Sequence, residues 1–230
     1  MSEKILNLGC GSNYIEGAVN VDHPGMKGKV KADVWYDLEK CVVLPKEHRE
    51  STGIFMGDGL EYALSCYLTP SKVYPAKYEP KMSDLNTLED HFDKIILRHV
   101  FEHVRNVIPM MEEIYRLLKP GGTVEITCPY WTSIWAWGDI GHVRAVNEMS
   151  FVWFSKEHYK KNREENTSCS YYEPDCDFEI KDIKLIPTTR YKPHGGNEMA
   201  KAQKQIAIME HKDRHLNVIE EIKVVLEAIK

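Results

Sequence analysis

The sequence predicts an α/β protein built on a doubly wound, mainly parallel sheet flanked by helices. Short apolar segments alternate with amphipathic helical segments, which is the pattern of strand–helix–strand units. The 230 residues are 43% hydrophobic and 28% charged, as in ordinary globular proteins. This length accommodates one α/β domain with a substantial core but not two. We therefore expect residues 1–230 to form a single domain.

Five short segments in the first part of the chain have the apolar character of buried strands. The first ends in Gly9-Cys10-Gly11, the second ends in an acid, and the fifth is stopped by Pro129. A sixth strand is predicted later, where apolar residues alternate in part. The six predicted strands are Ile5–Leu8, Ala18–Asp22, Ala32–Asp37, Asp93–Arg98, Thr123–Cys128 and Phe178–Ile186.

Three helices are predicted from the spacing of apolar residues. The strongest lies between the fourth and fifth strands: Asn106 can cap it, Pro109 is tolerated in its first turn, and residues 119–122 (KPGG) end it. Its inward face is expected to comprise Val107, Met111, Ile114 and Leu118. A short helix over Asn147–Phe154 would turn inward Met149, Val152 and Trp153. A last helix at about 216–230 carries one apolar stripe, either for packing on the sheet or for a homodimer surface.

The residues from about 45 to 90 form an insertion that interrupts this pattern. They contain several Pro, Gly and Tyr residues with little periodicity. A loop of this length in a compact domain is usually functional or mobile. Because the insertion follows the third strand, we expect it near the carboxyl edge of the sheet, where ligands bind in open α/β folds. It is either a lid over a bound ligand or a peripheral insertion.

Charge and cysteine content argue against several classes of protein. The formal net charge is −5, and the densest basic group is read as a solvated face, so nucleic acid is not an expected partner. The six cysteines form no CxxC pair, and we predict no metal site. Free thiols in the predicted core, with no signal peptide, indicate a cytoplasmic protein. No apolar stretch approaches about 20 residues, so we expect no membrane span.

The glycine loop after the first strand is the clearest candidate binding element. Glycine there lets the backbone turn sharply and approach a ligand closely. Asp22 follows Gly11 by eleven residues and ends the second strand, where an acid can accept both ribose hydroxyls of an adenosine. Tyr14 replaces the third glycine of GxGxxG, and the spacing to the acid is shorter than the roughly 20 residues expected for NAD. The alternative is a strand-to-loop turn in which the glycines only permit the backbone conformation and bind no ligand.

Five segments occur in an order that is typical of one enzyme family. They are LNLGCGSN (6–13), NVD (20–22), YDLE (36–39), FDKIILRHVFEHV (92–104) and EEIYRLLKPGGTVEITCP (112–129). Together they resemble class I S-adenosylmethionine-dependent methyltransferases, which have a Rossmann-like fold. The closest resemblance is to a branch with a shortened first helix and a later D-x-x-H-x-R segment, here residues 139–144. The resemblance covers roughly residues 4 to 155.

The resemblance implies that S-adenosylmethionine is the cofactor and assigns roles to several residues. Gly9, Cys10 and Gly11 would line its methionine and ribose portions, and Asp22 would bind the ribose hydroxyls. The adenine would contact Asp37 and Leu38, and the methionyl portion would lie over Arg98 and His99. Asn7 occupies a position where the family often has an acid, and an amide cannot neutralise the cofactor's ammonium group.

Residues beyond the fifth strand are the candidates for the acceptor side. His142 is suited to act as a general base for a hydroxyl, and Arg144 could hold an acidic substrate group by paired hydrogen bonds. The alternatives are that His142 caps a turn and that Arg144 makes an internal ion pair. Glu102 and His103 are expected at the start of the following helix; the alternative for His103 is that it only packs or satisfies a helix-end group. The neighbouring aromatic residues line an acceptor pocket or belong to the core: Tyr130, Trp131, Trp135 and Trp137.

The sequence thus favours methyl transfer from S-adenosylmethionine to a small-molecule or sugar acceptor. Oxygen is the expected acceptor atom because a candidate base is present. The alternative is a non-catalytic protein that binds the cofactor or a partner on the same fold, since one fold hosts many functions.

Overall fold

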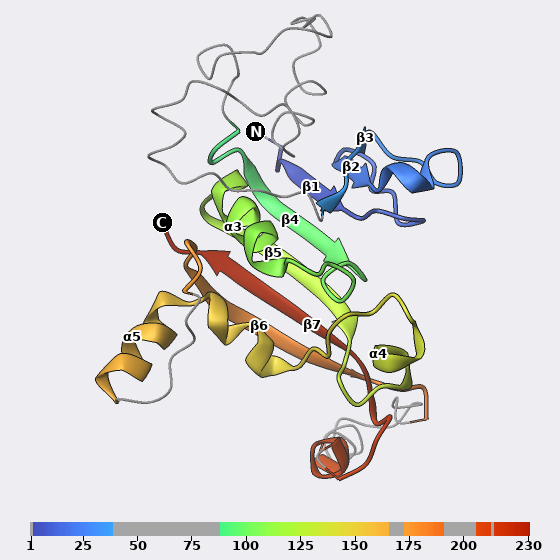
Figure 1. The fold of residues 1–230 in the computed structure, drawn as a ribbon, viewed down its shortest axis with the longest axis vertical. Helices are drawn as coiled ribbons and strands as arrows, with labels where there is room; N and C mark the ends of the chain where they lie inside the picture. The colour runs from blue at the N-terminus through green and yellow to red at the C-terminus, as the bar shows by residue number, and fades with distance from the viewer. Residues whose placement is uncertain (1, 39–87, 166–172, 191–205, 213) are drawn as a thin grey trace, which may run out of the picture.

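Seven strands form one sheet in the order β3-β2-β1-β4-β5-β7-β6 (Figure 1). The computed structural model describes residues 2–38, 88–165, 173–190, 206–212 and 214–230. The strands are β1 Ile5–Leu8, β2 Val19–Asp22, β3 Val34–Trp35, β4 Phe92–Arg98, β5 Leu118–Pro129, β6 Phe178–Pro187 and β7 Ile219–Ala228. The strands β1 to β5 pair in parallel, and β7 is antiparallel to both β5 and β6. The predicted Rossmann-like α/β fold is confirmed.

The strand order reverses between β1 and β4. From β1 the sheet extends through β2 to β3 on one side, and through β4 to β5 on the other. In open α/β sheets, ligands bind outside the carboxyl ends of the strands at such a switch point. The residues that follow β1, β2 and β4 therefore share the edge where a ligand is expected.

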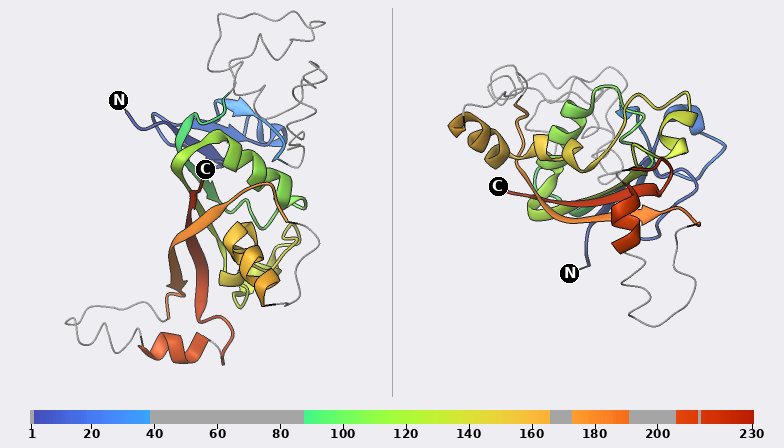
Figure 2. Two further views of the ribbon diagram at one scale, coloured as in Figure 1. Left: turned by 90° about the vertical axis from the view of Figure 1, so that its left-hand side faces the viewer. Right: turned by 90° about the horizontal axis from the view of Figure 1, so that it is seen from below.

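The helices that follow the strands pack outside the sheet (Figure 2). They are α3 Val107–Leu117, α4 Ile134–Gly138 and α5 Lys156–Glu164, with short 3-10 turns η1 Pro24–Met26, η4 Glu148–Ser150 and η5 Val152–Phe154. Both α3 and α5 lie on the same side of β6 and β7 (Figure 2). None of the helices in the described ranges is long and apolar enough to cross a membrane.

The core lies between α3 and the central strands. Helix α3 turns a row of completely buried side chains toward the sheet: Met110, Met111, Ile114 and Leu117. The strands contribute fully buried side chains in turn: Leu6, Leu8, Ile95, Leu97, Val124 and Ile126. Burial of this apolar surface, at about 25 cal/mol per Å², holds the carboxyl edge of the sheet in place. Asn106 is the N-cap residue as predicted, although its side chain makes no capping hydrogen bond.

The helix predicted at about 216–230 is wrong, because these residues form β7. Side chains of Ile222, Val224, Leu226 and Ala228 are buried in strict alternation, which is the period of a strand. The sequence IEEIKVVLEA satisfies the helical and the strand period over its length, and its β-branched residues favour the strand. One edge of β7 pairs with β5 and the other with β6. The homodimer that was expected to form through a C-terminal helix therefore lacks that helix.

The helix predicted over Asn147–Phe154 is also wrong. The segment forms the two 3-10 turns η4 and η5, and the side chains that it buries are Phe151 and Phe154. Met149 is 56% exposed and Trp153 is 36% exposed, although both were expected to point inward. A spacing of three residues between the buried side chains is that of a 3-10 helix.

Two predicted strands differ from the structure by more than one residue at an end. The strand expected at Ala32–Asp37 is only Val34–Trp35, and β5 begins at Leu118 rather than Thr123. The early part of β5 pairs irregularly with β4, with a register shift between Phe92 and Lys94. Gly122 permits this, because a Cβ there would lie 2.9 Å from the Lys119 carbonyl oxygen. The insertion expected at about 45–90 lies outside the described residues, apart from 88–90.

Candidate active site

The glycine loop after β1 approaches the end of β2. The amide of Gly11 donates a hydrogen bond of 2.5 Å to Asp22 Oδ2, and the amide of His23 donates one of 2.7 Å to Asp22 Oδ1. Asp22 is 7% exposed. The carboxylate therefore faces the loop. Oδ1 keeps a further lone pair for a ligand hydroxyl, and Oδ2 keeps one when the Cys10 thiol donates to the Lys31 carbonyl oxygen instead.

The two glycines of this loop have the left-handed backbone that glycine favours, with φ of 63° at Gly9 and 49° at Gly11. A Cβ at Gly9 would lie 2.2 Å from Cγ2 of Val100, so no larger residue fits there. A Cβ at Gly11 would meet no atom within 4 Å. The loop thus packs closely on the turn after β4 and leaves open space at Gly11.

Cys10, between these glycines, is buried and unreactive. Burial, reinforced by the charge of Asp22, raises the pKa of its thiol to about 12. Its Sγ lies 3.5 Å from Asp22 Oδ2 and 3.4 Å from the Lys31 carbonyl oxygen. At neutral pH the thiol stays protonated, so Cys10 shapes the loop and is no nucleophile.

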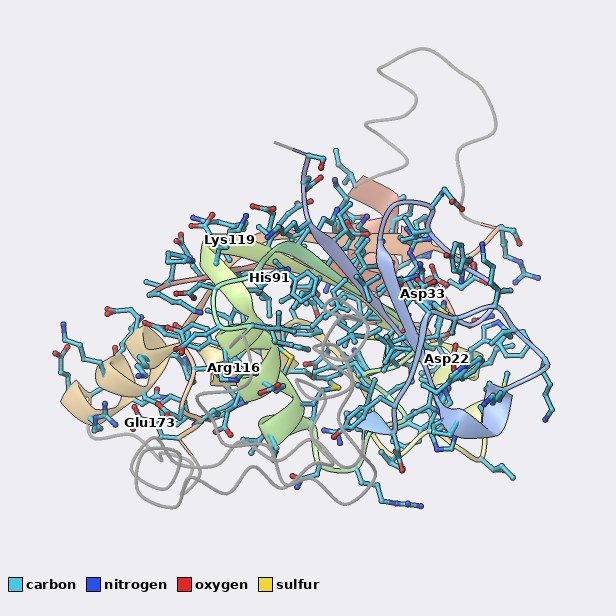
Figure 3. The ribbon with its side chains drawn as sticks, turned by 90° about the horizontal axis from the view of Figure 1, so that it is seen from above. Asp22, Asp33, His91, Arg116, Lys119 and Glu173 are labelled. Carbon is cyan, nitrogen blue, oxygen red and sulfur yellow. The ribbon has the colours of Figure 1, made fainter. Side chains whose placement is uncertain are left out.

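A second polar network supports the loop from behind. Asn7 is 1% exposed, and its Nδ2 donates to the Asn13 carbonyl and to Asn20 Oδ1, both at 2.9 Å. Asp33 accepts hydrogen bonds from Asn20 and from Tyr14. Burial alone would raise the pKa of Asp33, but these hydrogen bonds outweigh it and the pKa is lowered. Figure 3 shows Asp22 and Asp33 together among the first strands, far from Glu173 on the side of α5. Asn7 thus braces the loop.

The residues predicted after β3 border a segment outside the described ranges. Asp37 Oδ2 lies 3.8 Å from His23 Nε2, and Leu38 packs against the hydrophobic core. Both therefore lie beyond the carboxyl end of β3, on the Asp22 side of the sheet, as predicted.

At the end of β4, the exposed side chain of Arg98 is followed by His99, whose φ of 52° is left-handed. The His99 ring lies between two carboxylates: Nδ1 is 3.3 Å from Glu102 Oε1, and Nε2 is 3.2 Å from Glu221 Oε1. Hydrogen bonds to Glu102 and then Glu221 raise the pKa of His99 to about 10. His99 is therefore an imidazolium at neutral pH and links the turn after β4 to β7.

A cavity of about 350 Å³ opens beside His99. Its walls come from the ends of β4 and β5, from the region of α4, and from the first residues of β7. The lining residues are His99, His103, Pro129, Trp135, Asp139, His142, Glu220 and Glu221. Of the predicted aromatic cluster only Trp135 lines this cavity, whereas Tyr130 is buried and Trp131 and Trp137 are exposed.

His142 reaches this cavity and Arg144 does not line it. The His142 side chain is 8% exposed, and its Nδ1 lies 3.3 Å from the Ala136 carbonyl oxygen. Arg144 donates from Nη2 to the carbonyl oxygens of Val104 and Arg105, the second at 2.8 Å. Its guanidinium also lies 5.6 Å from the centre of the Phe101 ring. Arg144 thus ties its segment to the turn after β4.

The sequence of residues 2–175 matches the family described as "Methyltransferase domain". The chain belongs to this methyltransferase family. A comparison with curated proteins found no match.

Solved structures similar to this methyltransferase share only 12–15% identity with it. A SAM-dependent methyltransferase from Archaeoglobus fulgidus has a TM-score of 0.46 and 15% identity, covering 98% of this chain and 86% of its own. One from Mesorhizobium loti has a TM-score of 0.44 and 12% identity, covering 97% and 90%. A putative methyltransferase from Bacillus halodurans C-125 has a TM-score of 0.41 and 12% identity, covering 99% and 93%. Family membership rests on the family match and not on these likenesses.

The cofactor of the methyltransferase is S-adenosylmethionine, and the residues at the switch point fit it. Gly11 leaves open space where a Cβ would stand, and Asp22 presents a buried carboxylate beside that space. A carboxylate so placed can accept hydrogen bonds from two neighbouring hydroxyls. The reaction of the methyltransferase is accordingly the transfer of a methyl group from this cofactor.

Two residues of the cavity were not predicted, Glu220 and Glu221, and two predicted candidates lie elsewhere than expected. Glu102 and His103 were expected at a helix start, yet they lie in the turn before α3 and approach His142. Glu220 and Glu221 escaped notice because β7 was taken for a helix, which would place them elsewhere. The HVFEH segment was the available signal for Glu102 and His103, since it directly follows a buried strand.

Proposed function

We propose that this methyltransferase methylates an oxygen of a small-molecule or sugar acceptor bound in the cavity beside His99. The observation that carries the proposal is the orientation of His142. A carbonyl oxygen can only accept, so the Nδ1 that lies 3.3 Å from the Ala136 carbonyl carries the ring proton in the neutral imidazole. Nε2 then keeps a lone pair, as a base for a hydroxyl requires.

In this proposal His142 is the catalytic residue. S-adenosylmethionine supplies a methyl group on a positively charged sulfur, which makes the methyl carbon electrophilic. The acceptor oxygen forms a bond to that carbon as the carbon–sulfur bond breaks, and the electron pair of the broken bond stays on sulfur. His142 takes the hydroxyl proton at Nε2. The rest of the site contributes position, which accounts for a large part of such a rate enhancement.

Arg144 has a positioning role in this proposal. Its hydrogen bonds to Val104 and Arg105 hold the segment that carries His142 against the turn after β4. The amide of Val143 strengthens the same contact by donating to the Glu102 carbonyl at 2.9 Å. These contacts support the proposal that residues 139–144 are the D-x-x-H-x-R segment of the branch that the sequence resembles.

The cofactor contacts are proposed as follows. Asp22 binds the ribose hydroxyls, and the loop of Gly9, Cys10 and Gly11 lies along the ribose and methionine portions. Asp37 and Leu38 border the adenine, and Arg98 and His99 border the methionyl portion. Asn7 supports the loop and is the remaining predicted cofactor contact. We further propose that residues 1–230 form a single domain, because β6 and β7 complete the sheet that β1 begins.

The proposed function is tested with S-adenosylmethionine carrying a ¹³C-labelled methyl group. The purified protein is incubated with the fraction of a cell extract below about one kilodalton, and with a panel of free and nucleotide-linked sugars. NMR of the products distinguishes an O-methyl ether from methyl groups on nitrogen or sulfur. We expect an O-methyl product that His142→Ala forms much more slowly. Exclusive labelling of macromolecules, or of nitrogen or sulfur, would contradict the proposal.

A further inference from the structure

Three side chains with metal-ligating atoms converge at the cavity. One such atom from each of Glu102, His103 and His142 lies within 4.8 Å of the others. The rings of His103 and His142 are 4.5 Å apart, edge to face. The cluster joins the turn after β4 to the segment after α4, and neither segment alone contains it.

Both histidines are oriented as metal ligands usually are. His103 Nδ1 lies 3.2 Å from the Gly141 carbonyl oxygen, and His142 Nδ1 lies 3.3 Å from the Ala136 carbonyl oxygen. Each carbonyl fixes the proton on Nδ1, so each neutral ring offers a lone pair at Nε2. Histidines that bind metals commonly donate the other ring N–H to a backbone carbonyl or a carboxylate.

Glu102 supplies a buried negative charge with unused capacity. It is 1% exposed, and within the described part of the chain its Oε2 is buried without a hydrogen-bond partner. An unsatisfied, buried carboxylate oxygen is costly, and such atoms call for a bound ion or another partner.

Two carboxylates lie near His142 Nε2. Glu102 Oε1 and Asp139 Oδ2 each lie 4.0 Å from it. A neutral imidazole lone pair facing two carboxylates is unfavourable unless a positive charge lies between them. His99 Nδ1 contacts Oε1 of Glu102 at 3.3 Å, whereas Oε2 of Glu102 has no hydrogen-bond partner among the described residues.

We infer that Glu102, His103 and His142 bind a divalent transition-metal cation such as Zn²⁺ or Mn²⁺. Two histidines and one carboxylate are a frequent ligand set for such ions and leave coordination positions open. The ligand atoms need to approach one another by up to about 1.5 Å to reach metal–ligand distances of about 2.0–2.2 Å, which side-chain rotation can supply. Asp139 is close enough to support the site from the solvent side.

The inference rests on the proposed function for one consequence only. With a cation bound here, the Nε2 lone pair of His142 would be a ligand and would not be available as the base. In the cation-free protein, His142 takes the proton itself. Binding of the cation is measured without turnover, so the two proposals fail separately.

The test uses Co²⁺ as the probe, because its visible absorption reports the ligands directly. The full chain, without a histidine tag and stripped with a chelator, is titrated with Co²⁺ and separately with Zn²⁺ by calorimetry. We expect one equivalent to bind, with an absorption band that Zn²⁺ abolishes. Glu102→Gln and His103→Ala should each weaken binding more than tenfold. Because Glu102 is buried, circular dichroism must show that its variant is folded; His103 is exposed and gives an independent readout.

The matched control is His211→Ala. His211 and His215 stack with ring centres 4.9 Å apart and form the competing histidine pair on the surface. Unchanged binding in His211→Ala supports the proposed site. Loss of binding in that variant, retention in His103→Ala, or no binding of either metal would overturn the inference. Methyl transfer by the chelator-treated protein would leave the proposed function intact in that case.

Discussion

Gly11 donates its backbone N–H to Asp22 Oδ2 across 2.5 Å, and this contact joins the glycine loop to the second strand of the sheet. The carboxylate is therefore already oriented by the protein before any ligand binds. A preoriented acceptor loses less entropy on binding than a mobile one. The first predictions concern this contact.

Asp22→Asn should weaken cofactor binding while the fold persists. The amide removes charge-assisted hydrogen bonds to the ribose, each worth about 1.5–3 kcal/mol, or roughly tenfold or more in affinity. Calorimetric titration with S-adenosylhomocysteine measures the effect. Glu179→Gln, which changes an exposed carboxylate on β6, should bind as the wild type does. An unchanged dissociation constant in Asp22→Asn would place the ribose elsewhere.

S-adenosylhomocysteine should raise the melting temperature, and NAD should not. A ligand that binds only the folded state stabilises it by about 2.7 kcal/mol at a hundred times its dissociation constant. Thermal unfolding with each ligand checks this at matched concentrations. A shift with NAD alone would contradict the cofactor assignment.

Alanine at the two loop glycines should have different effects. Gly9→Ala places a Cβ 2.2 Å from Val100 Cγ2 and should lower stability and cofactor affinity together. Gly11→Ala meets no atom within 4 Å, so only its left-handed backbone is strained, at about 1–2 kcal/mol. Its stability should fall less than that of Gly9→Ala, while cofactor affinity should still drop if the open space holds the ligand. Urea unfolding and ligand titration of both variants separate the two effects; equal stabilities would argue against the close packing of Gly9.

Cys10 should resist alkylation in the native protein. Burial and the charge of Asp22 raise the pKa of Cys10 to about 12, so the reactive thiolate is scarce at pH 8. Mass spectrometry of peptides after iodoacetamide treatment measures this, with the denatured protein as the positive control. In Asp22→Asn the pKa of Cys10 should fall and its alkylation should become faster. Rapid native alkylation of the wild type would contradict the buried placement.

Arg144→Ala should slow methyl transfer without changing the affinity for S-adenosylhomocysteine. The variant loses the hydrogen bonds to Val104 and Arg105, so the segment carrying His142 is held less firmly. Arg144→Lys should recover only part of the rate, because one ammonium group cannot reproduce the planar guanidinium. Arg163→Ala, an exposed arginine paired with Glu173, is the control and should behave as the wild type. A raised acceptor KM with unchanged kcat would instead favour substrate anchoring by Arg144.

The sequence contained enough information for the first half of the sheet. The strands β1, β2 and β4 are short segments rich in apolar residues, and the glycine loop with Asp22 follows from their spacing. The C-terminal half was harder because IEEIKVVLEA fits two periods, and only the pairing with β5 and β6 decides between them. The contact of His99 with Glu221 depends on that pairing, so neither the charge of His99 nor the cavity wall could be predicted. The convergence of Glu102 and His103 on His142 likewise depends on a contact between distant segments.

The position of β7 between β5 and β6 has a consequence for biosynthesis. The ribosome releases β7 after the other six strands, yet β7 carries Glu220 and Glu221 into the cavity wall. The nascent chain can therefore form the sheet edge around Asp22 well before the cavity beside His99 is complete. Until β7 arrives, β5 and β6 each present an unpaired edge, which is the part of a growing polypeptide most prone to wrong association. Protection by chaperones, or rapid insertion of β7 between β5 and β6, would then govern the yield of active enzyme.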